Sequence, residues 1–350
     1  MEVWTRRLEA SQPAQESEDG FTVRRLGWAS GAALLRLRRA EKLHFSWTLF
    51  CRLISERKSY DVVIVQQALY PAIVTALACS LVGRPLVVRV ASTGVTSDFR
   101  TWGKLSGVVQ WLLRTRARAL VVLNEQGASE AIEVGFSPTR IHRIPNGVEA
   151  GPAPASRSSA AGPRIAYVGG FRSEKRVDML LQAWSMAGAP GELLLAGGGG
   201  LQASLETSAR DLGVAPTFLG EVAEPQHLLR TVDIFVLASD AEGMSNALLE
   251  AMAEGCACLA TFVGGNVDCL APGSEAPPPG GVIKGPGGWL VNRGDVSALA
   301  MALKELCGDA EIREELGRLA RKRVLSEYSI TRTAAAYVTL FQEVYGASPA

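Results

Sequence analysis

The sequence of 350 residues is poor in the side chains that most often bind metal ions. It has three histidines, His44, His142 and His227, and none of them lies near the pair Cys256-x-Cys258. Zinc sites are built mainly from grouped His and Cys ligands, so no metal centre is predicted. The six cysteines, at positions 51, 79, 256, 258, 269 and 307, lie in apolar stretches, which favours buried free thiols in a reducing compartment.

Three further absences exclude classes of protein. Neither Asp-x-Asp nor Gly-x4-Gly-Lys-Ser/Thr occurs, which argues against a metal-dependent transferase of the Asp-x-Asp type and against a P-loop nucleotidase. The first twenty residues lack the apolar core of a secretory signal. Residues 62–83 form a stretch of 22 residues without a charge. Because it contains Gln66, Gln67 and Pro71, it predicts a strand over 62–65 and a helix over 71–81 rather than a membrane span.

Charge is balanced over the whole chain but not along it. The formal net charge is +1, yet residues 1–150 carry 20 Lys+Arg and 13 Asp+Glu, a net charge of +7, whereas the remainder carries 16 and 22, a net charge of −6. Chance drift of the surface is one explanation, and an anionic partner of the first half is the other. Basic and aromatic side chains interleave over 24–58 and 100–118, with Trp28, Trp47, Trp102 and Trp111.

These two stretches suit an anionic membrane surface, and we expect no nucleic acid partner. The alternative is a pair of amphipathic helices packed on a sheet, with their basic faces in solvent. The localisation predicted is cytoplasmic, peripheral on the inner face of the membrane.

The length and a hydrophobic share of 47% predict two globular domains with sizeable cores. Apolar strand patterns alternate with helical ones, which implies parallel sheets covered by helices on both faces, an α/β doubly wound fold. In the first half the strands are expected at 61–65, 85–90, 119–123 and 140–144, with helices at 71–81, 103–117 and 126–134. In the second half the strands are expected at 164–168, 192–196, 216–219, 232–237, 256–260 and 289–291.

Between the halves, residues 151–163 have the composition of a linker. The predicted domains are therefore 1–150 and 164–325, followed by a C-terminal segment over 326–350. Residues 271–288, rich in proline and glycine, predict an irregular loop, and residues 296–345 predict helices.

The most informative segment is 238–254, Ala-Ser-Asp-Ala-Glu-Gly-Met-Ser-Asn-Ala-Leu-Leu-Glu-Ala-Met-Ala-Glu. It follows the apolar strand 232–237 and places two carboxylates, Glu242 and Glu250, eight residues apart. The predicted order is strand, turn and helix, with one acid at the turn and the other on the helix. Since amide groups at a helix start attract phosphate and a nearby carboxylate can bind ribose hydroxyls, this order favours a nucleotide ligand.

This segment resembles the Glu-x7-Glu signature of the retaining glycosyltransferases of family 4, which have the GT-B architecture. The likeness continues in the segments Ile144-Pro-Asn-Gly-Val148, Tyr167-Val-Gly-Gly-Phe-Arg-Ser-Glu-Lys175 and Gly264-Gly-Asn-Val-Asp268. It implies two Rossmann-like domains that face a central cleft, with the donor bound by the second. It also implies that the helix near 326–350 returns to the N-terminal domain, which here lacks the first strand and helix usual for the architecture.

The resemblance implies roles for several residues on the donor side. Glu250 binds the donor ribose, Glu242 contacts the transferred sugar, and Lys175 neutralises the diphosphate. Backbone amides of Gly243, Met244, Ser245 and Asn246 bind the same diphosphate. Gly170 stands where relatives carry arginine, and Arg172 is a candidate substitute. Gly198 belongs to a glycine turn near the donor, and Glu221 and Val222 belong to the loop that reads the base.

On the acceptor side the resemblance is weaker. Ala91 occupies the position of a histidine found in many relatives, and Ser92, Thr93 and Gly94 are candidates for lining the acceptor site.

The function predicted is transfer of a sugar from a UDP- or GDP-sugar, the co-substrate, to a hydroxyl of a glycan or lipid-linked acceptor, with retention and with no cofactor or metal. Two alternatives stay open, a nucleotide-sugar epimerase of the same fold and a non-catalytic donor-binding or partner subunit.

Overall fold

The structure, a computed structural model, describes residues 1–6, 11–18, 20–27, 35–68, 70–94, 97–100, 106–153, 162–188 and 191–346. Most of the predicted linker 151–163 lies outside these ranges, as do Trp28 and Trp102.

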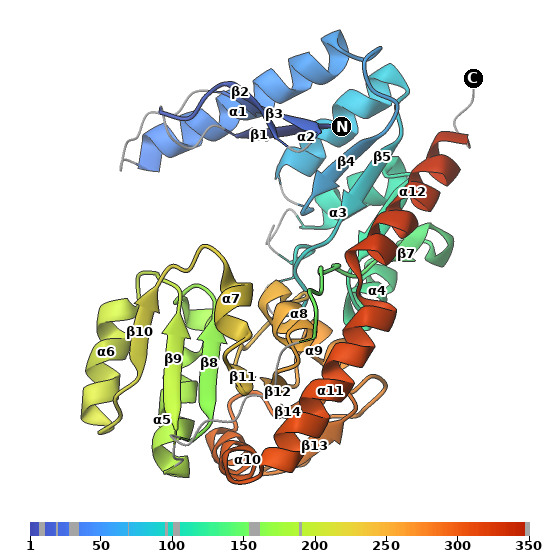
Figure 1. Cartoon of the computed structure of the whole chain (residues 1–350). Helices are drawn as coiled ribbons and strands as arrows, with labels where there is room; N and C mark the ends of the chain where they lie inside the picture. Colours follow the sequence, from blue (N-terminus) through green and yellow to red (C-terminus); the bar gives the residue numbers. More distant parts are fainter. Residues whose placement is uncertain are drawn as a thin grey trace.

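The first half of the chain is built on a parallel sheet of four strands in the order β4-β5-β6-β7 (Figure 1). The central strands are apolar on both faces, as expected where helices cover both sides of a sheet. The four strands are β4 (Val63–Gln66), β5 (Leu86–Arg89), β6 (Ala119–Val122) and β7 (Ile141–Arg143). They confirm the strands predicted from the alternation of the first half.

A second, smaller sheet lies at the start of the chain, in the order β1-β3-β2. Its strands are β1 (Glu2–Arg6), β2 (Gln15–Glu18) and β3 (Phe21–Leu26). Among the described strands, no backbone ladder joins this sheet to the four-stranded one. The first half therefore contains two sheets where the sequence predicted one. No strands were expected at 15–18 or 21–26, because the adjacent Arg24 and Arg25 obscure the alternation of Phe21 and Val23.

The helices of the first half are α1 (Leu35–Ser55), α2 (Tyr70–Val82), α3 (Ser106–Arg116) and α4 (Glu125–Glu133), with the short 3-10 helix η3 (Pro138–Arg140). Helix α2 buries the face that carries small side chains, which include Ala72, Ala76 and Cys79. The uncharged stretch 62–83 thus forms β4 and α2, as predicted. Within the described ranges, no helix combines the length and the apolar character that crossing a bilayer requires.

The second half forms a seven-stranded sheet in the order β10-β9-β8-β11-β12-β14-β13. All neighbouring strands run parallel except β13 and β14. The strands are β8 (Arg164–Val168), β9 (Glu192–Ala196), β10 (Thr217–Gly220), β11 (Ile234–Leu237), β12 (Ala257–Thr261), β13 (Val282–Gly285) and β14 (Gly288–Val291). The prediction of an irregular loop over 271–288 is wrong for β13, because the tight turn between Gly285 and Gly288 allows an antiparallel pair there.

The remaining elements cover this sheet and close the chain. They are η4 (Ser173–Lys175), α5 (Val177–Ala187), α6 (Gln202–Asp211), α7 (Pro225–Leu229), α8 (Asn246–Ala253), α9 (Gly264–Leu270), α10 (Val296–Gly308), α11 (Ala310–Glu327) and α12 (Ile330–Gly346). One large apolar core fills the space between the sheet and these helices. The second half is a doubly wound domain of the expected kind.

Helix α12 returns to the first half of the chain, where it runs beside the four-stranded sheet (Figure 1). Its buried residues Leu340 and Val344 pack against Val87, Ala119 and Val121 of that sheet. The molecule therefore consists of two Rossmann-like domains tied by a C-terminal helix. The domain limits at 150, 164 and 325 stay predictions.

Candidate active site

A cavity of about 470 Å³ lies between the two domains. Both domains contribute to its wall, as the central cleft predicted from the sequence requires. The N-terminal domain supplies Thr93, Gly94, Glu125 and Gln126, and the C-terminal domain supplies Asp240, Ala241, Glu242, Phe262, Val263, Gly264, Val267, Asp268 and Arg293.

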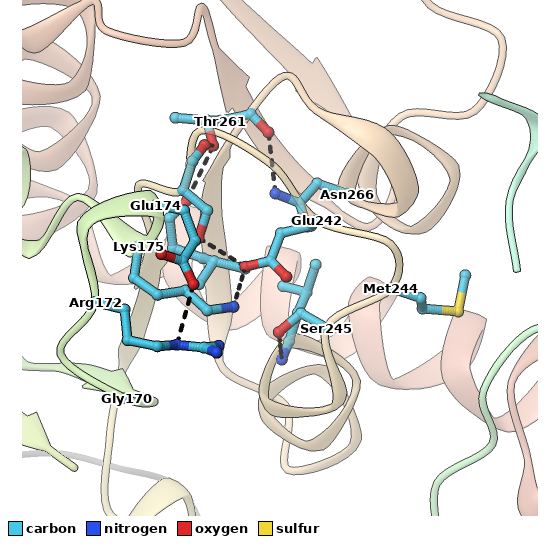
Figure 2. A network of polar contacts seen from close by, with 12 residues as sticks. Gly170, Arg172, Glu174, Lys175, Glu242, Met244, Ser245, Thr261 and Asn266 are labelled. Carbon is cyan, nitrogen blue, oxygen red and sulfur yellow. Dashed lines mark hydrogen bonds and ion pairs between the residues drawn. The ribbon is translucent and has the colours of Figure 1, made fainter. Parts of the chain in front are cut away.

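A buried ion pair stands at this cavity. The Nζ atom of Lys175, at the end of η4, lies 2.6 Å from Oε1 of Glu242, in the loop after β11 (Figure 2). Ser239 donates a further hydrogen bond of 2.7 Å to the same oxygen. The two charged side chains are only 16% and 7% exposed, so each needs the other to offset its lost hydration. The sequence named both residues, and the structure brings them together.

The loop from Gly243 to Asn246 leads from Glu242 into helix α8. Ser245 is the N-cap of α8, and its hydroxyl accepts the amide of Leu248 at 3.3 Å. The first turn of an α-helix leaves amide groups for an anion, so the N-terminus of α8 fits the predicted phosphate contact. Gly243 is required here by a close approach, because a Cβ atom would lie 1.8 Å from the carbonyl oxygen of Ala91.

The side chain of Met244 points away from the ion pair (Figure 2). Its sulfur accepts the backbone amide of Asn146 at 3.3 Å, so this side chain serves the contact between the domains. Only its backbone remains a candidate for donor binding.

Glu250 lies one turn into α8, after the amide-rich helix start. Its carboxyl group is half-buried, and burial raises its pKa above the ordinary value. Among the described residues its side chain has no hydrogen-bond or ion-pair partner, which leaves it available to a ligand hydroxyl.

Three loops at the carboxyl ends of β8, β9 and β10 lie side by side. The amide of Phe171 donates to the carbonyl of Gly198 at 2.8 Å, and a Cβ atom on Gly198 would lie 3.5 Å from the side chain of Glu221. This places Gly170, Gly198 and Glu221 in one region, with Val222 next along the chain. In open α/β sheets such strand ends form the ligand crevice.

Arg172 is 64% exposed and pairs with Glu174 at 3.1 Å (Figure 2). Among the described ion pairs, none joins its guanidinium group to Glu242. The idea that Arg172 substitutes for the arginine missing at Gly170 stays a prediction.

The loop that holds Ser92, Thr93 and Gly94 has a fixed shape. The buried carboxylate of Asp98 accepts the amides of Ala68 and Ala91 at 3.2 and 3.0 Å, although burial raises its pKa. The carboxylate of Glu130 accepts the amide of Gly94 at 2.7 Å. Two carboxylates thus fix the loop, and its residues Thr93 and Gly94 line the cavity. Their role on the acceptor side stays a prediction.

Sequence reasoning missed three residues that join the domains here. Asn124, the N-cap of α4, donates to the carbonyl of Gly243. Asn146 donates to Oδ1 of Asn246 at 2.8 Å. Asp268 accepts the amide of Glu125 at 2.9 Å, and burial raises its pKa. The only signal in the sequence was indirect, because Asn146 and Asp268 fall within segments that resemble the family but carry no predicted role.

Metal ligands do not gather in any described part of the chain, since no three His, Cys, Asp or Glu side chains there are placed to hold an ion.

Solved structures of other proteins show which fold the two domains form. Sucrose-phosphate synthase from Thermosynechococcus elongatus matches with a TM-score of 0.78 at 20% identity, over 99% of this chain and 89% of that one. Anabaena Alr3699/HepE in complex with UDP matches with a TM-score of 0.73 at 18% identity, over 87% of this chain and 84% of that one. The chain thus has the GT-B fold of glycosyltransferases.

Two family models then place the chain more narrowly. The "Glycosyl transferase 4-like domain" matches residues 1–147, and "Glycosyl transferases group 1" matches residues 162–309. The chain belongs to the group 1 glycosyltransferases.

Curated relatives match over part of their length. N-acetyl-alpha-D-glucosaminyl L-malate synthase of Bacillus anthracis is 28% identical over 184 residues, 51% of this chain and 45% of the relative. The capsular polysaccharide biosynthesis glycosyltransferase CapM of Staphylococcus aureus is 27% identical over 173 residues, 47% and 42% respectively. The chain spans about half the length of the curated relatives it matches.

Proposed function

We propose that this protein is a retaining glycosyltransferase that moves a hexosyl group from a UDP- or GDP-sugar to a hydroxyl of a glycan or lipid-linked acceptor. The observation that carries the proposal is the buried Lys175–Glu242 pair, which stands beside the N-terminus of α8 in a cavity between two Rossmann-like domains. The UDP complex of the Anabaena neighbour supports a nucleoside diphosphate as the donor's leaving group.

The donor contacts follow from the charges of the site. Lys175 and the amides from Gly243 to Asn246 bind the diphosphate, which carries two or more negative charges. The unpartnered carboxylate of Glu250 accepts the ribose hydroxyls. Glu242 faces the sugar, and Gly170 or Arg172, Gly198, Glu221 and Val222 surround the rest of the nucleotide.

The reaction breaks the bond between the anomeric carbon and the β-phosphate oxygen, and the acceptor oxygen bonds to that carbon from the same face. The acceptor proton passes to an oxygen of the leaving diphosphate, so atoms and charge balance. Negative charge grows on the phosphate as the bond breaks. A fixed ammonium group and aligned amides stabilise that charge more in the transition state than in the substrate. We propose that Lys175 supplies this charge without a metal ion and without a cofactor.

The acceptor enters from the N-terminal domain, where Ser92, Thr93 and Gly94 form the loop opposite Glu242. The neighbours and relatives whose names mention capsular polysaccharide, or a chain carried by undecaprenol diphosphate, support a glycan or lipid-linked acceptor.

We propose that the protein is cytoplasmic and binds the inner face of the membrane with the helical layer α1–α2–α3. Each of these neighbouring helices exposes large apolar side chains, namely Leu43, Trp47, Leu77, Leu81, Val108 and Trp111. Cations lie on the same helices or next to them, including Arg52, Arg114 and Arg116, and the first half carries a net charge of +7. Exposed apolar side chains and cations on the same helices are complementary to an anionic lipid surface.

The two alternatives make different predictions. An epimerase would change the sugar of a free nucleotide sugar without transfer, and a partner subunit would bind a nucleoside diphosphate without turnover. The relatives found are transferases, so the epimerase is not favoured.

The test begins with a thermal-shift screen of the full chain against UDP, GDP and their sugar conjugates. A true donor raises the unfolding temperature, because it binds only the folded state. Transfer is then measured by mass spectrometry with glycan and lipid-linked acceptors, using Lys175→Met as the inactive control. If neither nucleoside diphosphate stabilises the protein, the proposed function is wrong.

A further inference from the structure

The loop after Glu242 belongs to the C-terminal domain, but side chains of the N-terminal domain hold its backbone. Thr93 donates its hydroxyl to the carbonyl of Glu242 at 3.1 Å. Asn124 donates its amide to the carbonyl of Gly243, and Asn146 donates to the carbonyl of Met244 at 3.2 Å. Three consecutive carbonyl oxygens of one loop therefore accept hydrogen bonds from three side chains across the cleft.

The orientation of the two asparagine side chains follows from their other contacts. The Oδ1 atom of Asn124 accepts the amide of Gly127 at 2.7 Å, so its NH₂ group faces Gly243. The Oδ1 atom of Asn146 accepts a hydrogen bond from Arg89, so its NH₂ group faces Met244 and Asn246. Thr93 and Asn124 are 2% and 0% exposed, so water does not compete for these contacts.

The direction of these carbonyl groups also fixes the direction of the amide groups on the opposite side of the loop. In a trans peptide the carbonyl of one residue and the amide of the next point in opposite directions. None of the described peptide bonds is cis. The carbonyls of residues 242 to 244 face the N-terminal domain, so the amides of Gly243, Met244 and Ser245 face away from it. Within the described residues, these three amides donate to no protein acceptor.

Successive amides that point to one side form a concave site for an anion. We infer that Thr93, Asn124 and Asn146 are positioning residues that orient the amides of 243–245 to bind a diphosphate. This inference rests on the proposed function for the identity of the nucleotide, but not for the anion. It makes the N-terminal domain part of the donor site without direct contact with the donor.

A coupling between the domains follows. When the cleft opens, the carbonyls of Glu242 and Met244 lose these side-chain donors, and the carbonyl of Gly243 keeps only the amide of Gly265, which donates to it at 3.0 Å within the C-terminal domain. The three amides are then held in their common direction less firmly. A diphosphate binds the closed arrangement better than the open one, so it favours closure, and closure in turn raises diphosphate affinity by the same factor.

The experiment uses the full chain and removes one donor at a time. Thr93→Val keeps the shape of the side chain but loses the hydroxyl, and Thr93→Ser retains it as the matched control. Asn124→Ser keeps a good N-cap for α4 but is too short to reach the carbonyl of Gly243, and it adds no charge. Calorimetry measures the affinity for inorganic pyrophosphate, UDP, GDP and the corresponding nucleosides, and the unfolding temperature of each variant is recorded.

We expect Thr93→Val and Asn124→Ser each to weaken the binding of pyrophosphate and of the preferred nucleotide by about 5- to 10-fold, the value of one hydrogen bond. Thr93→Ser should stay near the wild type, and nucleoside affinity should not change. A purely structural role would weaken nucleoside binding as well.

Two results would overturn the inference. One is wild-type pyrophosphate affinity in both donor-less variants, which leaves the proposed function intact. The other is a wild-type protein that binds neither pyrophosphate nor either nucleotide, which removes the proposed function too. A wild type that binds pyrophosphate but no nucleotide would remove the proposed function alone, and the variants would still decide the positioning role.

Discussion

At the scale of single residues, Glu250 combines two opposed requirements. Its carboxylate has to be charged to accept ribose hydroxyls, yet burial raises its pKa because the charged form loses hydration. The folded state therefore holds this proton more tightly than the unfolded chain does. The resulting loss of stability is absent below the unfolded pKa of about 4.5 and complete above the raised folded pKa.

Glu250→Gln should therefore raise the unfolding temperature at neutral pH and leave it unchanged in strong acid. The same substitution should weaken UDP or GDP binding by at least about 10-fold, since it removes a charged acceptor. Calorimetry and thermal unfolding across pH measure both effects. An amide variant that binds nucleotide as tightly as the wild type would show that Glu250 does not hold ribose.

Lys175 gives a second prediction at this scale. Lys175→Met should lower the transfer rate by about 100-fold or more, because it removes the charge that faces the leaving phosphate. It also leaves the nearly buried Glu242 without its cation, so the protein should lose stability. Lys175→Arg is the control that retains the positive charge. Equal rates for the two variants would contradict the electrostatic role, and the measurement is the initial rate of sugar transfer.

The sequence predicted some residues of the candidate site and missed others. The difference between the two groups has a physical cause. Glu242, Lys175 and the cap at Ser245 belong to short segments with their own turn and helix patterns, and the structure places Glu242 and Lys175 in contact. Asn124 and Asn146 act across more than ninety residues of sequence, on carbonyl groups that every residue possesses. No residue pattern marks a backbone acceptor, so these contacts needed the fold.

At the scale of elements, apolar periodicity predicted the parallel strands of the two large sheets and most helices, because burial on both faces leaves a clear apolar run. It failed for β2 and β13, which lie at the edges of their sheets, and for β3, which pairs with β1 and β2. Their residues alternate with arginine, lysine or glutamate. In these three strands, pairing with a neighbour rather than burial on both faces decides the structure.

Helix α12 supplies a prediction for this scale. Leu340 is 2% exposed against the four-stranded sheet, so Leu340→Ala should cost about 2–5 kcal/mol of stability by leaving a cavity. Val338 on the same helix is 54% exposed, and Val338→Ala should change stability by less than about 0.5 kcal/mol. Denaturant unfolding compares the two. Similar unfolding midpoints for the two variants would mean that the packing of α12 does not stabilise the N-terminal domain.

At the scale of the whole molecule, the uneven charge predicts binding to anionic membranes. The chain should sediment with vesicles of phosphatidylglycerol but not with vesicles of phosphatidylcholine, and binding should weaken as salt rises. Replacing Trp47 and Trp111 by serine should reduce binding to the anionic vesicles. Met301→Ser, at a residue 53% exposed on the C-terminal domain, is the matched control. Unchanged binding of the double tryptophan variant would argue against the α1–α3 surface.

The division of the first half into two sheets has a consequence for how the molecule unfolds locally. The sheet β1-β3-β2 meets the rest of the domain through side chains, such as the contact of Trp4 with Tyr60 and the pair Arg24–Glu56. Because no backbone ladder joins the two sheets among the described strands, the smaller one can open while β4-β5-β6-β7 stay paired. Amide hydrogens of β1, β2 and β3 should therefore exchange with deuterium long before those of β5 and β6, as a separate cooperative unit whose opening leaves the sheet β4-β5-β6-β7 intact.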